Sequence, residues 1–432
     1  MESVWHKTEM PEFERLKGNL NTDVLVIGGG MVGILCTYFL TQNGVNCALV
    51  EQGRIGSGVT GNTTAKITAQ HGLIYGKIYG KYGAEAAKKY YVANAQAVQT
   101  YGKLCADIDC DFEWKENAVY ARDDRRLLER ETETLEKIGA KAYLTEPSDL
   151  PFSVAGAVVL PDGAQFHPLK FLAAISKSLP IYENTAVREM FGNTAVTDCG
   201  KIHAKEVLVA THFPFLNKHG GYFLKLYQER SYVIALQNAG RVGRMYVDEQ
   251  TDGLSFREYG DLLLLGGGGG HTGKPMGGWS ELRQFARTHY PESQEKFFWA
   301  TQDCMTLDGM PYIGRYSAST PHLWVATGFG KWGMTGSMMA AEILCDEILG
   351  RPNDAADLFR PSRSMLHRQL LINGWNAATN LLTFSEKRCP HLGCALKWNP
   401  AEHSWDCPCH GSRFSENGEL LDNPATGNLK KM

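Results

Sequence analysis

Two short segments rich in cysteine and histidine constrain this chain more tightly than any other feature. Residues 389–394 read Cys-Pro-His-Leu-Gly-Cys, and residues 407–412 read Cys-Pro-Cys-His-Gly-Ser. The pattern is Cys-x-His, fifteen residues, then Cys-x-x-His. Thiolates and imidazoles at such close spacing are typical ligands of a transition-metal centre. The carboxyl-terminal part of the chain is therefore predicted to fold around a metal centre.

The paired pattern favours an iron-sulfur cluster. One cysteine and one histidine from each loop make up the ligand set of a Rieske cluster, which holds two irons and two sulfides and carries electrons one at a time. The alternative is a structural zinc site, because four cysteines and two histidines lie within 22 residues. Zinc ligands usually pair across two to four residues, whereas Cys407 and Cys409 are separated by one. A four-ligand zinc site would also leave two of the six groups unused.

The segment closely resembles Rieske proteins of the cytochrome bc type. That resemblance implies that Cys389 and Cys407 bind one iron and that His391 and His410 bind the other. It also implies a disulfide between the two remaining cysteines of the loops, Cys394 and Cys409.

Two departures from that pattern bear on the cluster. Ser412 is present, but Phe414 occupies the position of a tyrosine that donates a hydrogen bond to the cluster in high-potential proteins. With one donor fewer, we expect a potential in the lower half of the Rieske range of roughly −150 to +300 mV. Only 44 residues run from Cys389 to the end of the sequence. Such a short segment buries too little surface to fold alone, so we expect it to depend on the rest of the protein.

Composition bounds the remaining 388 residues only loosely. A chain of 432 residues with 43% hydrophobic and 21% charged residues is long enough for two or three globular domains. A net charge of −3 gives no indication of nucleic-acid binding. Residues 24–40 lack charge, but their glycine cluster suits a turn better than a membrane span. The first residues do not resemble a signal peptide, so we expect a cytoplasmic protein without a transmembrane segment. The cysteines outside the two loops show no framework spacing and are expected to be reduced.

A glycine-rich motif near the amino terminus predicts dinucleotide binding. Residues 24–27 form an apolar strand, residues 28–33 match G-x-G-x-x-G, and residues 34–42 indicate a helix. A second strand, residues 47–50, ends at Glu51. Gly28 makes the tight turn, Gly30 lets amides approach a pyrophosphate, Gly33 allows close packing, and Glu51 can bind ribose hydroxyls.

The next segment favours FAD over NAD. Residues 54–66 are rich in glycine, serine and threonine, and they resemble the flavin-contacting segment of the D-amino-acid oxidase superfamily, which includes glycine and sarcosine oxidases. The alternative is a solvated loop. The resemblance recurs, in the right order, at residues 162–170, 185–187, 205–211, 306–314 and 325–337. At position 212 this chain has His where the family has Gly. The resemblance covers roughly residues 20–360, and the whole chain resembles a bacterial group with a carboxyl-terminal Rieske segment.

The resemblance implies the architecture. We expect an α/β fold with an FAD-binding Rossmann-like domain, an inserted antiparallel-sheet substrate domain and a small, truncated all-β Rieske module. The flavoprotein should span residues 1–360, with FAD-binding segments at about 20–75, 150–212 and 300–350. Residues 361–382 should form a linker helix, and residues 383–432 the module. The positions expected to bind FAD are Gly28, Gly30, Met31, Val32, Gly33, Glu51, Gln52, Thr60, Thr63, Thr64, Ala65, Lys66, Val187, Ala210, Thr211, Gly314, Gly328, Lys331, Trp332, Gly333, Met334 and Thr335.

Other elements are predicted from residue patterns. Helices are expected at about 84–105, 123–137 and 365–382, and strands at 230–236 and 262–265. Residues 266–270 are five consecutive glycines. They indicate either a close approach to flavin or substrate, or a flexible turn.

Candidate catalytic residues follow from position alone. The superfamily's substrate domain offers a cation and aromatic walls, for which Arg230, Tyr232, Arg257 and Tyr259 are candidates. Arginines on a strand are also common as surface residues. Lys331, beside Trp332, is a candidate to activate oxygen or to stabilise a flavin anion, or it is a solvated turn residue.

These features predict an oxidoreductase. We expect an FAD-dependent dehydrogenase that oxidises an amino acid or another amine, with electrons leaving singly through the cluster to an external protein or quinone. The alternatives are a redox sensor, or a reductase that takes electrons from a carrier.

Overall fold

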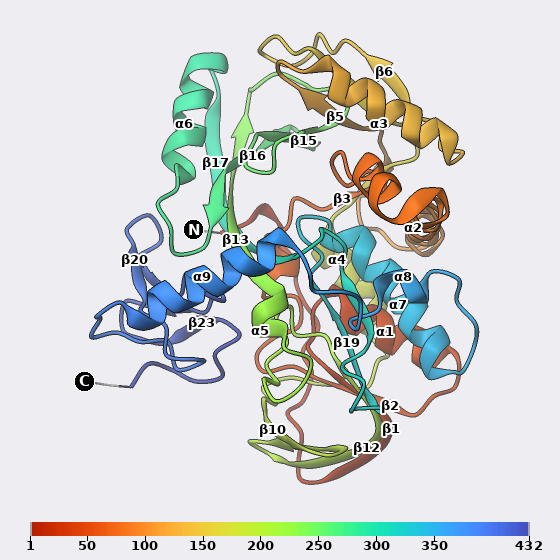
Figure 1. The fold of residues 1–432 in the computed structure, drawn as a ribbon, viewed down its shortest axis with the longest axis vertical. Helices are drawn as coiled ribbons and strands as arrows, with labels where there is room; N and C mark the ends of the chain where they lie inside the picture. Colours follow the sequence, from red (N-terminus) through yellow and green to blue (C-terminus); the bar gives the residue numbers. More distant parts are fainter. Residues whose placement is uncertain (1, 431–432) are drawn as a thin grey trace.

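The computed structural model describes residues 2–430, which fold around two large sheets with a small module at one side (Figure 1). The first sheet contains the glycine motif. Its core is a parallel arrangement in which β12, β1, β2 and β9 lie in that order. The strands of this sheet are β1 Leu20–Ile27, β2 Cys47–Val50, β9 Ile181–Tyr182, β10 Val187–Phe191, β11 Thr194–Thr197, β12 Gly200–Val209, β18 Tyr312–Arg315 and β19 Leu323–Thr327. The last four residues of β1 are buried, as a central parallel strand covered on both faces requires.

The second sheet is mostly antiparallel and also has eight strands. One pair, β14 with β5, is parallel, so the expected antiparallel sheet is in detail a mixed one. Its order is β17 Gln294–Thr306, β13 Leu226–Gln237, β16 Leu262–His271, β15 Ser255–Tyr259, β14 Met245–Asp248, β5 Asn117–Ala121, β7 Gly156–Leu160 and β6 Tyr143–Thr145. A third sheet has three strands, in the order β3 Lys66–Ile67, β8 Ala164–Gln165 and β4 Glu113–Trp114.

Helices cover the two sheets. In the first domain, α1 packs against α7, and α7 also contacts α2. The helical elements are η1 Val4–Lys7, α1 Met31–Gln42, η2 Val59–Asn62, α2 Tyr75–Cys105, α3 Arg125–Lys137, α4 Pro168–Ser176, α5 Tyr222–Lys225, α6 Gly278–His289, α7 Gly333–Ile348, α8 Ala356–Phe359 and α9 Arg368–Leu382. Among the described residues, none of these helices is both long and apolar enough to cross a bilayer.

The carboxyl-terminal module is a four-stranded antiparallel sheet beside the lower end of β13 (Figure 1). Its strands are β20 Lys397–Asn399, β21 Ser404–Asp406, β22 Arg413–Ser415 and β23 Leu420–Asp422. The module's apolar core consists of a few side chains, four of them cysteines. This confirms the expected fold class, with a small all-β module attached to an α/β flavoprotein fold.

Several expected elements differ in detail. The helix expected from residue 84 begins at Tyr75, and Gly83, with φ 86°, kinks it at the point where the sequence pattern starts. The strand expected at 262–265 continues through the five glycines to His271. The flexible-turn interpretation of these glycines is therefore wrong: the Cβ that a side chain would add at Gly269 collides with the carbonyl oxygen of Arg230.

Candidate functional site

A cavity of about 730 Å³ opens between the first sheet and the second. Both helix α1 and helix α7 begin at its wall. Neither N-cap residue, Gly30 or Trp332, makes a side-chain capping bond, although the hydroxyl of Thr60 accepts from the amide of Met31 at 3.1 Å. Uncapped amides at a helix amino terminus attract negative charge. The cavity therefore offers two anion-stabilising positions, as a bound dinucleotide with a flavin ring requires.

The glycine motif shapes one end of the cavity. Gly28 adopts φ 115°, and a side chain there would collide with Ala210. A Cβ at Gly33 would collide with the carbonyl oxygen of Gly28, so only glycine lets α1 approach β1. Gly33 does not itself line the cavity. The motif thus brings backbone amides, rather than side chains, to the place where a pyrophosphate would bind.

Glu51 lies beside these amides. Its carboxylate accepts hydrogen bonds from the amides of Gly29 (2.7 Å) and Gly53 (2.8 Å). Burial raises the pKa of Glu51, and the amide bonds oppose that shift. A carboxylate can accept about four hydrogen bonds, so Glu51 retains capacity for ribose hydroxyls.

Most residues expected to bind FAD line this cavity. They are Gly28, Gly30, Met31, Val32, Glu51, Gln52, Thr60, Thr63, Thr64, Lys66, Val187, Ala210, Thr211, Gly328, Lys331, Trp332, Gly333 and Met334. Ala65 is fully buried, Thr335 accepts a hydrogen bond from the amide of Thr68, and Gly314 lies on β18 near Glu347. With Gly33, these three support the wall rather than face the cavity.

A buried histidine supports the turn before α7. His71 stacks on Trp332 at 5.0 Å between ring centroids and hydrogen-bonds the Tyr90 hydroxyl at 2.7 Å. Burial lowers the pKa of His71 to about 3, so the ring is neutral at pH 7. No motif in the sequence indicates this residue.

Of the first two substrate candidates, Tyr232 is part of the cavity lining, whereas Arg230 is not. Arg230 is 3% exposed and binds Glu402 of the module. The Tyr232 ring packs on Trp279 at 4.9 Å, and its hydroxyl lies 3.5 Å from Asn399. Arg230 thus binds the module, while Tyr232 lies between the cavity and the module, and its contact with a substrate stays a prediction.

Arg257 and Tyr259 bind other parts of the chain. The Arg257 guanidinium donates to the carbonyl oxygens of Thr64, Ala65 and Phe166, so it holds the segment expected to contact flavin. The Tyr259 hydroxyl donates to Asp111 at 2.9 Å. Neither residue lines the cavity.

Lys331 does line the cavity, but its charge is matched. Its ammonium group donates to the carbonyl oxygen of Thr251 and lies 3.5 Å from a carboxylate oxygen of Glu229. Nearby, Asp303 accepts a hydrogen bond from Ser231 at 2.8 Å. Burial raises the pKa of Asp303 to about 6, which leaves it mostly ionised at neutral pH. Sequence reasoning missed both Asp303 and Ser231.

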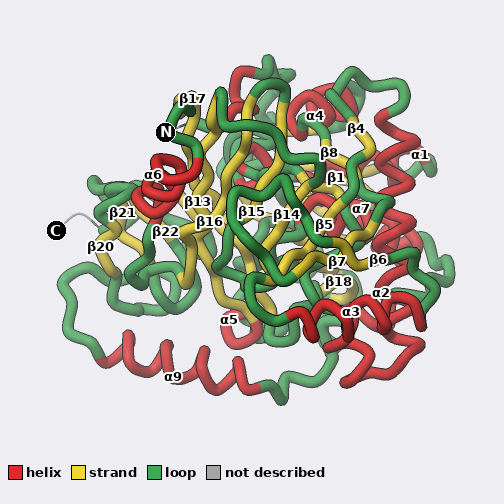
Figure 2. Tube along the Cα trace, turned by 90° about the horizontal axis from the view of Figure 1, so that it is seen from above, coloured by secondary structure: helices red, strands yellow, loops and turns green. Residues whose placement is uncertain are grey.

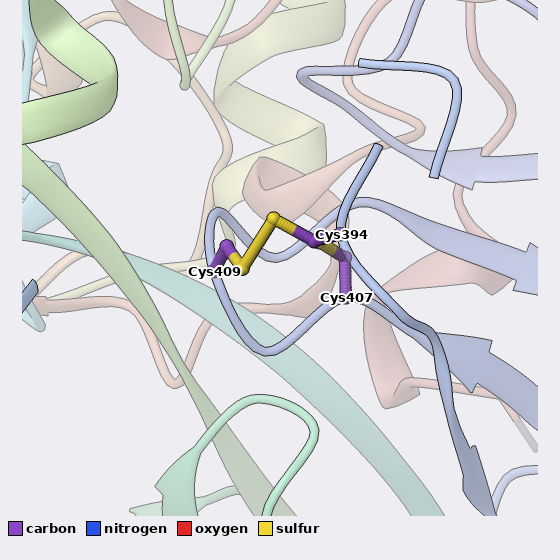
Figure 3. Close-up of side chains that lie close together, drawn as sticks. All are labelled: Cys394, Cys407 and Cys409. Atoms are coloured by element: carbon purple, nitrogen blue, oxygen red, sulfur yellow. A yellow bond between two sulfur atoms is a disulfide. The ribbon is translucent and has the colours of Figure 1, made fainter. Parts of the chain in front are cut away.

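The module holds a second candidate site between its two loops. A disulfide joins Cys394 to Cys409, with Cys407 close beside it, as expected from the resemblance (Figure 3). The sulfur atoms of Cys394, Cys407 and Cys409 lie within 4.8 Å of one another, but the two in the disulfide are not thiolates. The free cysteines here are Cys389 and Cys407, both buried.

The two histidines turn toward this enclosed space. The rings of His391 and His410 lie 4.9 Å apart, and each Nδ1 is buried without a hydrogen-bond partner. The opposite nitrogens are occupied, since Nε2 of His391 bonds Asn217 (2.9 Å) and Nε2 of His410 bonds the carbonyl oxygen of Phe223 (3.0 Å). Burial lowers the pKa of His391 to about 4 and that of His410 to about 3. Neutral imidazoles with an unpaired inward nitrogen are suited to binding a metal.

Hydrogen-bond donors surround the two free thiols. The amides of His391 and Leu392 and the hydroxyl of Ser412 point at the Cys389 sulfur. The amides of Cys409 and His410 point at the Cys407 sulfur. Such donors stabilise negative charge on cluster sulfurs. The two free thiols and the two imidazoles therefore supply the ligand types of a two-iron cluster of the Rieske kind.

One strand separates the two sites. On β13, Ser231 and Val233 line the cavity, while the Gln228 amide donates to the carbonyl oxygen of His410 at 2.9 Å. On the adjacent β17, Asp303 faces the cavity, while Gln302 donates to the carbonyl oxygen of Gly411 at 2.8 Å. The cluster loop thus packs directly on the back of the cavity wall.

His212 lies where these parts meet. It lines the cavity, and its Nε2 lies 3.1 Å from the amide oxygen of Gln228. Its backbone has φ 63°, in the region that the family's glycine adopts freely. The Asn423 side chain of the module donates to the carbonyl oxygens of Thr211 (2.5 Å) and Phe213 (3.0 Å). Residues of the module therefore close part of the cavity.

Comparison with known proteins agrees with both sites. Residues 23–347 match the family described as FAD dependent oxidoreductase, and residues 363–432 match the Rieske [2Fe-2S] domain. The "Putative Rieske 2Fe-2S iron-sulfur protein YhfW" of Bacillus subtilis is 32% identical, over all of this chain and 97% of that protein.

Two solved structures share the fold. L-proline dehydrogenase from P. horikoshii is 18% identical with a TM-score of 0.68, covering 81% of this chain and 98% of its own. Glycine oxidase from Geobacillus kaustophilus is 19% identical with a TM-score of 0.68, covering 80% of this chain and 100% of its own. The chain belongs to the family of FAD-dependent oxidoreductases and carries a Rieske two-iron two-sulfur domain at its carboxyl-terminal end.

Proposed function

We propose that the protein is a cytoplasmic FAD-dependent dehydrogenase that oxidises an amino acid or another amine and passes electrons singly to an external protein or quinone. The observation that carries this proposal is the shared wall: β13 lines the cavity with one face and holds the cluster loop with the other. Two redox sites that share a strand can exchange electrons without movement of either domain. A fused one-electron site favours a dehydrogenase over an oxidase, since oxygen is not needed as the acceptor.

The cofactors supply the redox chemistry. FAD accepts a hydride from the carbon beside an amine, and a Rieske cluster carries one electron at a time. The chain positions the substrate and tunes the charge around it. We assign FAD to the cavity-lining residues named above, and the cluster to Cys389, His391, Cys407 and His410. We retain residues 1–360, 361–382 and 383–432 as the domain division.

The polar groups of the cavity support an amine substrate. Asp303 is 8% exposed, and Ser231 satisfies only part of its hydrogen-bonding capacity. An ionised carboxylate in such a place is a partner for a substrate ammonium group. Lys331, expected from the sequence to activate oxygen or to stabilise a flavin anion, is a cavity-lining cation that we now assign to a substrate carboxylate, with part of its charge balanced by Glu229. The two proteins that share the fold, a proline dehydrogenase and a glycine oxidase, support the same substrate class.

Anaerobic mixing tests the proposal. The purified protein, with both cofactors bound, is mixed with a panel of amino acids and secondary amines while the flavin and cluster absorption are followed. Bleaching of the flavin followed by reduction of the cluster supports the dehydrogenase. If no compound bleaches the flavin, the proposal fails, and a sensor or a reductase fed by a carrier becomes the better explanation.

A variant of one proposed cluster ligand then tests whether electrons leave the protein through the cluster. In His410→Ala, substrate should still bleach the flavin at the rate of the unchanged protein, while turnover with an artificial one-electron acceptor is lost. His403→Ala is the matched control, because His403 lies in the turn between β20 and β21, away from the two cluster loops. Unchanged turnover in His410→Ala would show that electrons do not leave through the cluster.

A further inference from the structure

Helix α9 exposes large apolar side chains and buries a polar one. Leu371, Trp375 and Leu382 are 75%, 72% and 87% exposed, and their spacing places them along one side of the helix. Asn373 is 8% exposed, and its amide donates to the carbonyl oxygen of Leu224 at 3.2 Å. In α3 the arrangement is the ordinary one, since Leu128 is fully buried. A helix that hides asparagine and exposes leucine and tryptophan has a face suited to a nonpolar partner.

The exposed apolar surface extends beyond the helix at both ends. Leu366 precedes it at 88% exposure, and Phe384 follows it at 92%. Leu392, in the first cluster loop, is 40% exposed. We call Leu366, Leu371, Trp375, Leu382, Phe384 and Leu392 the α9 face. Viewed from above, α9 lies along an outer edge of the molecule (Figure 2), so the face forms a ridge rather than a groove.

Positive charge accompanies this ridge. Between residues 366 and 398 the chain carries Arg368, Lys387, Arg388 and Lys397 against one acid, Glu386, although the whole protein has a net charge of −3. Among the described residues, none of these four cations has a carboxylate partner within 4.0 Å. Arg388 donates to backbone carbonyls and Lys387 lies over the Trp405 ring, but neither charge is neutralised by a carboxylate, so the local excess of positive charge remains.

We propose that the α9 face binds the surface of an anionic lipid bilayer, with α9 lying in the plane of the interface. Leucine, tryptophan and phenylalanine side chains on one side of a helix, flanked by arginine and lysine, are the composition of an interfacial helix. A second copy of this chain would bring one patch of excess positive charge close to another, which is unfavourable. An anionic bilayer satisfies both the apolar ridge and the cations at once.

Lipid binding would bring the cluster loop to the membrane. The Arg388 guanidinium joins helix and loop by donating to the carbonyl oxygens of Leu381 (3.2 Å) and Gly393 (2.8 Å). The amide of Ala395 also donates to the carbonyl oxygen of Asn380 at 3.0 Å. The loop that carries His391 is thus fixed to the helix. Access of the cluster to a membrane-bound acceptor rests on the proposed function, whereas the binding of α9 to lipid does not.

Vesicle flotation with the full holoprotein tests the proposal. The vesicles contain phosphatidylcholine alone or phosphatidylcholine with a minority of phosphatidylglycerol. We expect the protein to float with the anionic vesicles at low salt and to be released as salt is raised. The double variant Trp375→Ser, Leu382→Ser should lower the floated fraction at least about tenfold. Arg368→Gln with Lys397→Gln should lower binding to anionic vesicles.

A matched control separates the face from hydrophobicity in general. Phe191 is 62% exposed on β10, in another part of the molecule, so Phe191→Ser should bind vesicles like the unchanged protein. Retained flavin and cluster absorption show that each variant is folded. Absence of binding to anionic vesicles would overturn the proposal. Concentration-dependent dimerisation that the double variant abolishes, without vesicle binding, would overturn it in favour of a second copy.

Discussion

The cavity and the cluster pocket lie on opposite faces of β13, yet they are built by different means. The cluster pocket is made of side chains from two loops, with the Nδ1 atoms of His391 and His410 turned inward. The flavin cavity is made largely of backbone, at the starts of α1 and α7 and along glycine-rich segments. A side-chain site fails when one atom is removed, whereas a backbone site fails when an atom is added. Substitutions away from residues shared by both sites, such as Asn423, should therefore affect one cofactor at a time and act in opposite chemical directions.

The largest expected effect is loss of the cluster. Cys407→Ser removes one of the two free thiols of the pocket, and an alcohol is a poor ligand for iron. We expect complete loss of the Rieske electron paramagnetic resonance signal with one FAD per chain retained. Cys199→Ser, at a free cysteine outside both loops, is the control and should keep both. Loss of FAD together with the cluster would contradict independent sites.

The reciprocal change adds one carbon to the flavin site. In Gly33→Ala the new Cβ collides with the carbonyl oxygen of Gly28, and overpacking of this kind costs about 2–3 kcal/mol. We expect FAD affinity to fall about 100-fold, measured by fluorescence titration of the apoprotein, with the cluster signal unchanged. Gly374→Ala is the control and should keep normal FAD affinity, because a Cβ added at Gly374 has no atom within 4 Å. Normal FAD affinity in Gly33→Ala would refute the close-packing account.

Replacing Arg230 tests the contact between β13 and the module. Its guanidinium binds Glu402, whose side chain is fully buried, so Arg230→Met leaves a buried charge with one partner fewer. We expect a loss of about 3 kcal/mol in the free energy of unfolding, measured by denaturant titration followed through the cluster absorption. Arg283→Met breaks the more exposed pair with Glu295 and should cost less than about 1 kcal/mol. Equal losses would mean that the buried pair does not hold the module.

Replacing Asp303 tests whether its carboxyl group, on the cavity side of the sheet, is desolvated. Burial raises its pKa to about 6 from 3.8, so the folded chain holds this proton more tightly than the unfolded chain. The free energy of unfolding therefore falls as pH rises from about 4 to about 6. Asp303→Asn has no carboxyl group to desolvate. The difference in the free energy of unfolding between the variant and the unchanged protein should therefore grow by about 1 kcal/mol, in favour of the variant, from about pH 5 to about pH 8. Parallel stability curves over that interval would show that the carboxyl group is not desolvated.

The smallest expected effect concerns the potential of the cluster. Phe414 is fully buried in the module's core and offers no hydroxyl. Phe414→Tyr should raise the potential, because a hydrogen bond to a cluster sulfur stabilises the reduced state. Protein-film voltammetry measures the shift, and Phe414→Leu serves as the control without a hydroxyl. A potential in the upper half of the Rieske range for the unchanged protein would refute the low-potential prediction.

The sequence allowed the cluster pocket to be predicted residue by residue. Its ligands are set by side-chain chemistry at fixed spacing, and the structure brings the four candidates together, although their ligation remains a prediction. The disulfide Cys394–Cys409 is confirmed. The bonds of Gln228 and Gln302 to its loop attach the short module to the flavoprotein, and its inability to fold alone stays a prediction.

The cavity was predictable only as segments. The sequence pattern selected Arg230 and Tyr232 on β13; of these two, Tyr232 lines the cavity and Arg230 does not, and Ser231 between them was missed. Successive side chains of a strand point to opposite faces of the sheet. Which of them faces the cavity therefore depends on what packs against each face. That information is tertiary, and it is absent from a single segment of sequence. Asp303 and His71 were missed for the same reason, since no local motif marks either residue.

Reduction of the flavin by light under anaerobic conditions tests the shared wall most directly, because it needs no substrate. The holoprotein is illuminated with an electron donor, and the flavin absorption and the cluster's paramagnetic signal are followed together. If β13 joins two communicating sites, the cluster signal appears as the flavin is reduced, at a rate independent of protein concentration. A flavin that becomes fully reduced while the cluster stays oxidised, or a rate that rises with protein concentration, would contradict transfer within one chain.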